Sequence, residues 1–519
     1  MLRMNDIQWA VLGGCLLFLG GLDAMGATTQ WARGSVFEDR NRNQIRDDGE
    51  PGLAGVRVSN GRQIVGTDQA GRWRLPIRSG DIIFVIKPRN WMTPVSRDQL
   101  PRFYYIHKPE GSPPSAYPGV APTGPLPRQI DFPLYPQTEP DRFQVIFFGD
   151  PQPRNQQEID YIAHDVVEEL IGTEARFGVT LGDILFDDLS LFGSFNATVG
   201  MIGIPWYNVI GNHDLNLDSE NDGDSDETFH RFFGPNFYAF DYGRVHFIVL
   251  DNVDWQGPEH SYRGALDAAQ LQFVANDLKE VPEDQLIVLS MHIPLTNMVN
   301  RHELYRLLED RPFSVSLSGH THWQGHQFIR SSDGWMGSEP HHHIVNVTVS
   351  GTWWRGFQDE VGIPHATMRD GAPNGYSILT FDGNRYSFEF KAARRPADYQ
   401  MNIYAPEMFS SRNADSVDLQ VNVFAGSEKS QVRFRIVGAT DWISMTPILG
   451  PDPEYVRTRN RELEAAPEAP ALNSPVDSLH LWRAQFPPGL PVGTHRIEVV
   501  TVDAFGTKYS ASRIVRVTE

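Results

Sequence analysis

The pattern of apolar and polar positions divides the chain into three stretches. Between residues 28 and 140, short alternating apolar runs such as 34–37 and 73–75 are separated by Gly, Asn and Asp. Such punctuation is typical of a small antiparallel β-sandwich. The segment 90–140 is rich in proline and is predicted to be an irregular wrapping loop or linker.

The stretch 141–393 has a different pattern. Apolar runs at 143–148, 178–181, 206–210, 245–250, 286–291 and 314–317 are typical of strands buried on both faces. Helical patterns lie between several of them, at 156–170, 265–278 and 302–308. Alternating strands and helices predict an α/β domain built in layers.

The stretch 394–519 returns to short alternating runs, for example at 417–423, 431–436 and 495–503. These runs predict a second β-sandwich. The polar, proline-rich segment 451–475 is predicted to be an exposed loop.

Residues 1–27 predict a secretory signal peptide. Arg3 precedes an apolar run at 9–22, and small residues follow at Ala24, Gly26 and Ala27. An uncleaved anchor or a lipoprotein site at Cys15 are the alternatives. Cleavage would give a periplasmic or secreted protein with no stable membrane span. Cys15 is the one cysteine of the chain, so the mature protein would form no disulfide.

Composition narrows the class of partner. Hydrophobic residues make up 40% and charged residues 21%, which excludes wholesale disorder. The formal net charge is −20, whereas a protein that binds nucleic acid usually presents a basic surface. We therefore expect no nucleic-acid partner, and the oligomeric state is left open.

Polar clusters follow most of the predicted strands of the middle stretch. Each cluster stands directly after its strand: Asp150 with Gln152, Asp183, Asn212 with His213 and Asp214, His292, and His320 with His322. Loops past the carboxyl ends of strands gather at one edge of an α/β sheet. Carboxylate, carboxamide and imidazole without sulfur suit manganese, iron or zinc.

These motifs resemble those of the calcineurin-like metallophosphoesterases, whose pattern is D-x-H, G-D, G-N-H-D/E, a lone His and G-H-x-H. The likeness spans residues 150–322, and the flanking stretches look like the family's bacterial three-part members. The resemblance implies a central α/β sandwich of two mixed sheets flanked by helices, with β-sandwich domains at 28–140 and 394–519.

The resemblance also implies a role for each matching residue. Asp150, Gln152 and His322 would hold one divalent metal ion, Asn212, His292 and His320 a second, and Asp183 would bridge both. A hydroxide between the metals would attack a phosphomonoester or phosphodiester. His213 would protonate the leaving oxygen as general acid, and Asp214 would orient His213.

Gln152 departs from the family pattern, which has histidine at this position. An amide oxygen is a neutral and harder donor than imidazole. We therefore hypothesise weaker binding of the first metal and a preference for manganese or iron over zinc.

A second group of residues is a candidate substrate pocket: Trp353, Trp354, Arg355, Asn374 and Tyr376. Paired tryptophans could stack on a ring while the arginine meets a phosphate. Alternatively, both tryptophans pack under the C-terminal domain. His341–His343 is more simply interpreted as a solvated loop or as a donor to the metal ligands than as a metal site.

The early part of the chain carries a loop with the spacing of calcium ligands. Positions one, three, five, seven, nine and twelve of an EF-hand-type loop would be Asp39, Asn41, Asn43, Ile45, Asp47 and Glu50. Gln44 stands where such loops have glycine, and no helical pattern flanks the segment. The alternative is a solvated Asx-rich hairpin.

Together these observations predict an exported metal-dependent phosphoesterase with a small phosphoester substrate. The alternative is a surface protein that binds carbohydrate or protein and carries a catalytically silent metallophosphoesterase domain. A metal site that has lost its activity usually also loses ligands. Here nearly every position of the motif is kept, so we favour the interpretation as an enzyme.

Overall fold

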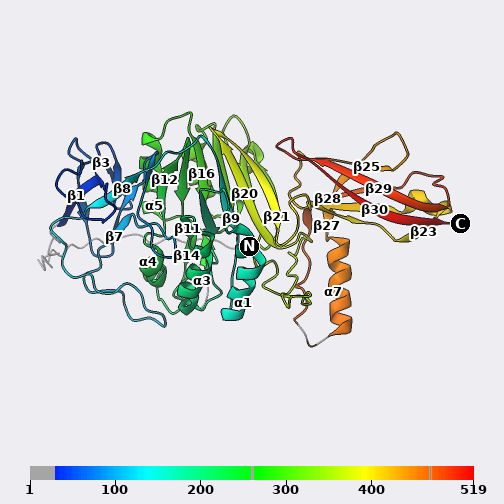
Figure 1. Cartoon of the computed structure of the whole chain (residues 1–519), viewed down its shortest axis with the longest axis horizontal. Helices are drawn as coiled ribbons and strands as arrows, with labels where there is room; N and C mark the ends of the chain where they lie inside the picture. Colours follow the sequence, from blue (N-terminus) through cyan, green and yellow to red (C-terminus); the bar gives the residue numbers. More distant parts are fainter. Residues whose placement is uncertain (1–29, 259–261, 467, 469) are drawn as a thin grey trace, which may run out of the picture.

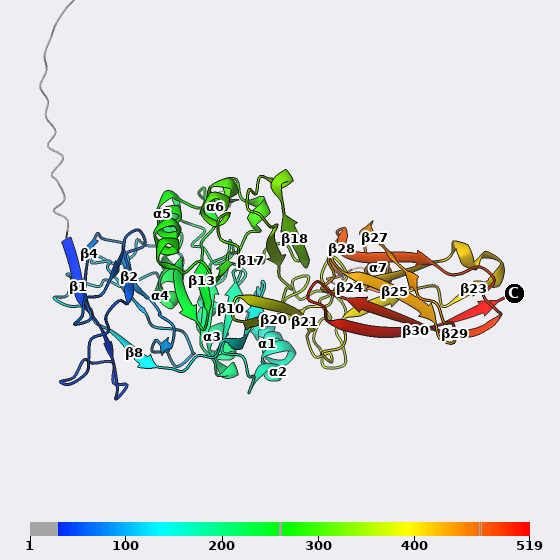
Figure 2. The same cartoon turned by 90° about the horizontal axis from the view of Figure 1, so that it is seen from above.

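The computed structural model describes residues 30–519 except 259–261, 467 and 469. The predicted signal peptide therefore lies outside the described residues. Figures 1 and 2 show three parts in a row along the long axis. A β-rich N-terminal part lies at one end, the layered α/β part lies in the middle, and a second β-rich part reaches the C-terminus.

The N-terminal part consists of two four-stranded sheets. Their strands are, in spatial order, β4 (Arg72–Ile77), β1 (Gln30–Glu38), β8 (Phe132–Pro136) and β6 (Trp91–Met92), and then β3 (Ile64–Gly66), β2 (Arg57–Ser59), β5 (Ile82–Ile86) and β7 (Tyr104–Ile106). Val36, Val58, Leu75 and Val85 lie in the core between them.

The prediction of an irregular segment at 90–140 is wrong in part. Strand β8 pairs in parallel with β1, with Val36 opposite Phe132. Phe132 and Leu134 are buried in the core. Two prolines within β8 lower the local strand signal, because proline cannot donate a hydrogen bond to a neighbouring strand.

Two mixed sheets form the middle part. One has the order β11 (Trp206–Val209), β10 (Phe177–Leu181), β9 (Arg142–Phe148), β20 (Gly375–Asp382) and β21 (Arg385–Ala392). The other has the order β12 (Tyr238–Tyr242), β13 (Val245–Val249), β16 (Leu286–Ser290), β17 (Ser314–Ser318), β19 (His341–Val345) and β18 (Gly325–Ile329). A hairpin of β14 (Val253–Trp255) and β15 (Tyr262–Gly264) is separate from them.

Alternation along β9 explains how the first sheet is buried on both faces. Val145 and Phe147 belong to a core shared with the second sheet, whereas Ile146 and Phe148 belong to a core shared with helices. Successive side chains of a strand point to opposite faces, so an almost continuous apolar run fills both cores. This arrangement is the predicted α/β sandwich.

The helices of the middle part cover the outer faces of the sandwich. Their bounds are α1 (Gln156–Ile162), α2 (Glu168–Leu170), α3 (Phe192–Val199), α4 (Glu227–Phe233), α5 (Ala268–Asp277) and α6 (Arg301–Leu308). A π-helical turn, Ala163–Val167, joins α1 to α2, so the predicted helix at 156–170 is continuous. Among the described residues, no helix is long and apolar enough to cross a membrane.

Two further sheets form the C-terminal part. Their strands are, in spatial order, β22 (Met401–Tyr404), β24 (Asp418–Val423), β28 (Ser478–Gln485) and β27 (Thr446–Gly450), and then β23 (Met408–Ser410), β30 (Lys508–Thr518), β29 (Gly493–Val502), β25 (Gln431–Ile436) and β26 (Ile443–Ser444). Leu419, Val421, Phe434, Ile497 and Val499 lie in the core between the sheets.

The predicted exposed loop at 451–475 is wrong in part, because it contains helix α7 (Pro453–Ala465). The Asp452 side chain accepts a hydrogen bond from the Tyr455 backbone N–H, and Pro453 occupies the first turn. Both features favour the start of a helix. Tyr455 and Glu462 are buried, so one side of α7 packs against the rest of the molecule.

Candidate metal centre

The predicted metal ligands come together where five strands end. Asp150 follows β9, Asp183 follows β10 and Asn212 follows β11, all within the parallel half of the first sheet. His292 and His320 follow β16 and β17, which are parallel neighbours in the second sheet. Parallel strands end at the same edge of their sheet, so both sheets deliver their ligands to one place.

The backbone at these ligands is unusual. The φ angle is +41° at Asp150, +40° at Gln152, +48° at Asp183, +76° at His320 and +54° at His322. A non-glycine residue in this region costs about 1–3 kcal/mol and persists where the surrounding structure holds it. Left-handed backbone turns aim these side chains inward from the strand ends.

Two glycines allow the ligands to pack closely. A Cβ at Gly319 would lie 2.4 Å from Asp150 Oδ2, and a Cβ at Gly182 would lie 2.5 Å from His292 Nδ1. Neither distance is tolerated between real atoms. Gly319 and Gly182 are therefore required by the approach of a candidate ligand from another strand.

His292 lies at the centre of one half of the cluster. Its Nε2 atom is 3.0 Å from Asn212 Oδ1, 3.2 Å from Asp183 Oδ1 and 3.2 Å from His320 Nδ1. Its Nδ1 atom donates to the Leu181 carbonyl at 2.9 Å, which turns Nε2 towards the other ligands. The ligand atoms of Asp183, His292 and His320 lie within 4.8 Å of one another, as in a metal site.

The other half contains Asp150, Gln152 and His322. His322 Nδ1 donates to the Gly351 carbonyl at 2.6 Å, and its Nε2 lies 3.9 Å from Asp150 Oδ1. Gln152 Nε2 donates to Asp183 Oδ2 at 2.7 Å.

Gln152 provides a direct test of whether a metal fits here. Its side chain is 1% exposed, and its Oε1 atom has no hydrogen-bond partner among the described residues. A buried carbonyl oxygen without a partner is costly, and a divalent cation would satisfy it. The donor set and this oxygen therefore both fit a metal.

The pKa values of the candidate ligands in the absence of metal are strongly shifted. Burial disfavours a charged His292, but Asp183 and Asp150 outweigh it and raise its pKa to about 9. Burial and the charge of His292 lower the pKa of His320 to about 3. Burial raises the pKa of Asp150 to about 7. Among the candidate ligands, a protonated His292 supplies the positive charge in the absence of metal, and binding of a metal to its ring nitrogen would release that proton.

His213 lies at the edge of the cluster with its ring held from two sides. Its Nδ1 donates to Asp187 Oδ1 at 2.7 Å, and Phe186 stacks on the ring with centroids 4.4 Å apart. Burial opposes a charged ring, but Asp183 and Asp187 outweigh it and raise the pKa of His213 to about 9. A protonated imidazole fits a general acid.

The prediction that Asp214 orients His213 is wrong. The Asp214 carboxylate is fully buried and accepts hydrogen bonds from the backbone N–H groups of Ile184, Leu185 and Gly211. It therefore joins the loops after β10 and β11. Asp187 orients the ring instead, and sequence reasoning missed it although it stands four residues after Asp183 in the same loop.

The candidate substrate residues separate into two groups. Trp353 packs on His322, with ring centroids 4.0 Å apart. Arg355, two residues further along the chain, is half-buried. Trp354 is 3% exposed, packs on Tyr161 and donates to the Pro151 carbonyl. Trp353 therefore borders the metal centre, whereas Trp354 is part of the core.

Asn374 and Tyr376 also have structural contacts. Asn374 Nδ2 donates to Asp165 Oδ2 and to the Val349 carbonyl, and Tyr376 is buried beside Phe148. His341–His343 are likewise buried, as strand β19, and His341 and His343 hydrogen-bond Ser316. The expectation of a solvated loop there is wrong.

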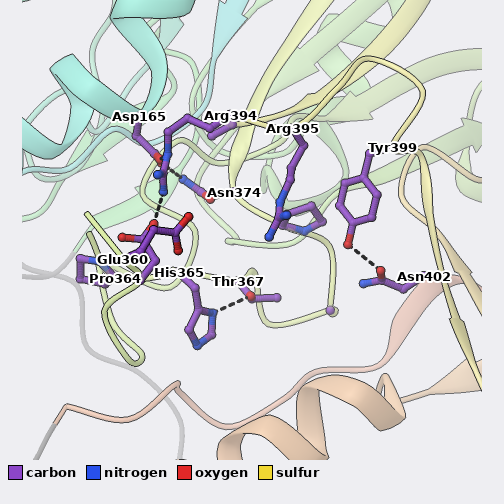
Figure 3. A pocket seen from close by; sticks show the side chains of 14 residues that line it. Asp165, Glu360, Pro364, His365, Thr367, Asn374, Arg394, Arg395, Tyr399 and Asn402 are labelled. Carbon is purple, nitrogen blue, oxygen red and sulfur yellow. Dashed lines mark hydrogen bonds and ion pairs between the residues drawn. The ribbon is translucent and has the colours of Figure 1, made fainter. Parts of the chain in front are cut away.

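Asn374 lines a separate cavity of about 220 Å³ (Figure 3). Arg394 forms a 2.6 Å ion pair with Asp165, which Figure 3 shows. It also pairs with Asp359. His365 faces Thr367, and Tyr399 faces Asn402. The side chains named here already have hydrogen-bond or ion-pair partners, and Tyr399 and Asn402 belong to the start of the C-terminal part. We therefore interpret the cavity as a polar junction beside that part.

Comparisons with known protein families identify the class of protein to which the chain belongs. The family model of calcineurin-like phosphoesterase matches residues 143–324. The models of the N terminal and the C terminal of calcineurin-like phosphoesterase match residues 39–117 and 343–509. The chain therefore belongs to the calcineurin-like phosphoesterases of the three-domain type, which makes it a metal-dependent phosphoester hydrolase.

Two solved structures resemble the chain weakly. The structure of PhoD covers 76% of this chain and 83% of its own, at 9% identity and a TM-score of 0.37. Purple acid phosphatase PPD1 from yellow lupin (Lupinus luteus) seeds covers 65% and 67%, at 13% identity and a TM-score of 0.35. No curated protein matches the chain.

Proposed function

We propose that the chain is an exported phosphoesterase that uses two divalent metal ions to hydrolyse a small phosphomonoester or phosphodiester. The observation that carries this proposal is the convergence of the candidate ligands, with a buried Gln152 Oε1 that has no hydrogen-bond partner in the part of the chain that the structure describes. Export rests on the pattern of residues 1–27 alone.

Each half of the cluster would hold one ion. The first site would use Asp150, Gln152 and His322, the second Asn212, His292 and His320, and Asp183 would face both. Bound divalent cations supply Lewis-acid stabilisation of phosphoryl oxygens and an activated water. Asp183 suits the bridging role because Oδ1 faces His292 and Oδ2 faces Gln152.

His213 would act as the general acid. Asp187 holds its Nδ1 proton, which leaves Nε2 free to protonate the leaving oxygen. Trp353 would form one wall of the substrate site, because its ring lies against the ligand His322.

The test is turnover of p-nitrophenyl phosphate and bis-p-nitrophenyl phosphate by metal-free protein titrated with manganese, iron or zinc. Asp183→Asn removes the shared carboxylate charge and is expected to lower kcat at least about a hundredfold. Asp382→Asn, on an exposed residue at the far end of β20, is the matched control and should keep full activity.

The preferred ester distinguishes a monoesterase from a diesterase, and highest activity with zinc would contradict the hypothesis on Gln152. Equal turnover by Asp183→Asn and wild type would refute the two-metal proposal. Tight metal binding without turnover of any ester in a panel of natural phosphoesters would favour the silent binding protein instead.

A further inference from the structure

The loop after β1, residues 39–50, gathers oxygen donors far from the metal centre. We call it the N-terminal acidic loop. It begins where the Asp39 backbone N–H donates to the Leu134 carbonyl of β8, and it ends before the Leu53 N–H donates to the Val36 carbonyl of β1. Its conformation is therefore coupled to the pairing of β1 and β8.

Asp39 has a feature that hydrogen bonds within the loop leave unexplained. Its side chain is 1% exposed, and Oδ2 accepts from the Gln44 N–H at 2.8 Å. Its Oδ1 atom is buried and has no partner among the described residues. A carboxylate oxygen removed from water without a donor is strongly destabilising unless a cation meets it.

No residue that the structure describes offers such a cation to Asp39. None of Asp39, Asp47 and Glu50 forms an ion pair with any residue that the structure describes. The three arginines of the loop turn elsewhere: Arg40 pairs with Glu38, Arg42 lies over Tyr135, and Arg46 donates to Ser35. Asp39, Asp47 and Glu50 thus share one loop and have no positively charged partner among the described residues.

The other candidate ligands of the loop are held by hydrogen bonds within the loop. Both oxygens of Glu50 accept backbone N–H bonds, from Arg40 at 2.9 Å and Asp47 at 3.0 Å, which orient the carboxylate across the loop. Asn41 and Asn43 both donate to Asp47 Oδ2, at 2.7 and 2.9 Å. A cation could replace the side-chain amide N–H groups of Asn41 and Asn43 at the Asp47 carboxylate.

The backbone at Gln44 adopts the conformation that a calcium loop requires, although the residue is not glycine. It stands where EF-hand-type loops need glycine for a sharp turn. Its φ angle is +65°, so the backbone adopts the left-handed turn in spite of the side chain. Gln44 is exposed, so its side chain points into solvent and blocks nothing.

We propose that the N-terminal acidic loop binds one calcium ion. The ligands would be the side chains of Asp39, Asn41, Asn43, Asp47 and Glu50 and the carbonyl of Ile45. All of these ligand atoms are oxygen, which suits a hard cation such as calcium. This set contains no imidazole, unlike the ligand set of the candidate metal centre. The ion would fasten β1 to β8 in a part of the chain that contains no cysteine.

The test is calcium binding to the full chain, measured by calorimetry and by metal analysis after dialysis. Asp183→Asn protein is used throughout, so that the metal centre contributes equally to every arm. Asp39→Asn keeps the size of the side chain and an acceptor for Gln44 but removes the unpartnered anionic oxygen. Asp48→Asn changes an exposed carboxylate of the same loop at a position without a ligand role.

The unmodified loop and Asp48→Asn are expected to bind one more calcium than Asp39→Asn at millimolar calcium. Calcium should also raise their unfolding temperature by several degrees and leave that of Asp39→Asn unchanged. Equal calcium in all three proteins, or equal affinity for magnesium, would overturn the proposal. Should Asp39→Asn misfold by circular dichroism, Glu50→Gln takes its place with the same expectations.

Discussion

Asp187 and Asp214 illustrate how roles are decided at the scale of single residues. Both are carboxylates close to His213 in the chain or in space, yet only Asp187 contacts the ring. Asp214 is turned away by three backbone N–H donors. Adjacency in sequence is a poor guide here, because the loop after Gly211 turns sharply and sends neighbouring side chains in opposite directions.

Asp187→Asn is expected to reduce kcat about tenfold or more for esters with poor leaving groups. It should change little for p-nitrophenyl esters, which leave without protonation. The physical reason is loss of the charge that keeps the imidazole protonated and oriented. The measurement is kcat against leaving-group pKa, with metal content determined in parallel.

Asp188→Asn is the neighbouring control for this prediction, since Asp188 binds Ser190 and not His213. A uniform loss of activity across all leaving groups, or a loss of bound metal, would contradict the assigned role of Asp187.

Helix α7 shows how a single element depends on its first residues. Asp452 and Pro453 are the helix-start signals that a sequence can carry, but the prolines around them favoured a loop. Asp452 also accepts from Asn422 Nδ2 at 2.9 Å, which joins α7 to β24. The cap therefore has a second role, in docking the helix.

Asp452→Ala is expected to destabilise the C-terminal part by about 1–2 kcal/mol, because it removes an N-cap and a partner of buried Asn422. Asp452→Asn retains an acceptor oxygen and should restore most of the loss. Urea denaturation followed by fluorescence would measure both, and equal midpoints for Asp452→Ala and wild type would contradict the prediction.

At the scale of the whole molecule, a buried charge network joins the N-terminal part to the middle part. Arg57 of β2 pairs with Asp277 at 2.7 Å and with Asp241 at 3.0 Å. His246 lies between the same two carboxylates, at 2.7 Å from Asp241 and 2.6 Å from Asp277. The network couples the position of the β-sandwich to the second sheet of the catalytic domain.

This network predicts a loss of stability at alkaline pH. Burial disfavours the charged form of His246, but Asp277 and Asp241 outweigh it and raise its pKa to about 9. A raised folded-state pKa stabilises the fold below the unfolded value of about 6.5, and the contribution of roughly 3 kcal/mol disappears as pH rises through the folded value.

Thermal unfolding between pH 6 and pH 10 would measure this effect, with His246→Gln as the comparison. The wild type should lose more stability than the variant over that interval. Parallel curves would show that His246 does not carry the charge.

Much of the catalytic fold, and the convergence of the candidate ligands at one edge of it, could be predicted from the sequence. Buried strands appear in the sequence as apolar runs, and the polar residues directly after them lie at the strand ends. The local pattern is therefore enough to place Asp150, Asp183 and His292 at one edge of the α/β sandwich. Membership of the family could likewise be inferred, because it depends on short motifs.

Contacts between segments distant in the chain could not be predicted in this way. The pairing of β1 with β8, the role of Asp187, the burial of Tyr376 and the unpartnered oxygens of Asp39 and Gln152 all depend on which atoms meet after folding. Periodicity and spacing report the environment of a segment but not its neighbours. Only packing in three dimensions determines which donors each buried oxygen receives, and therefore where a cation is needed.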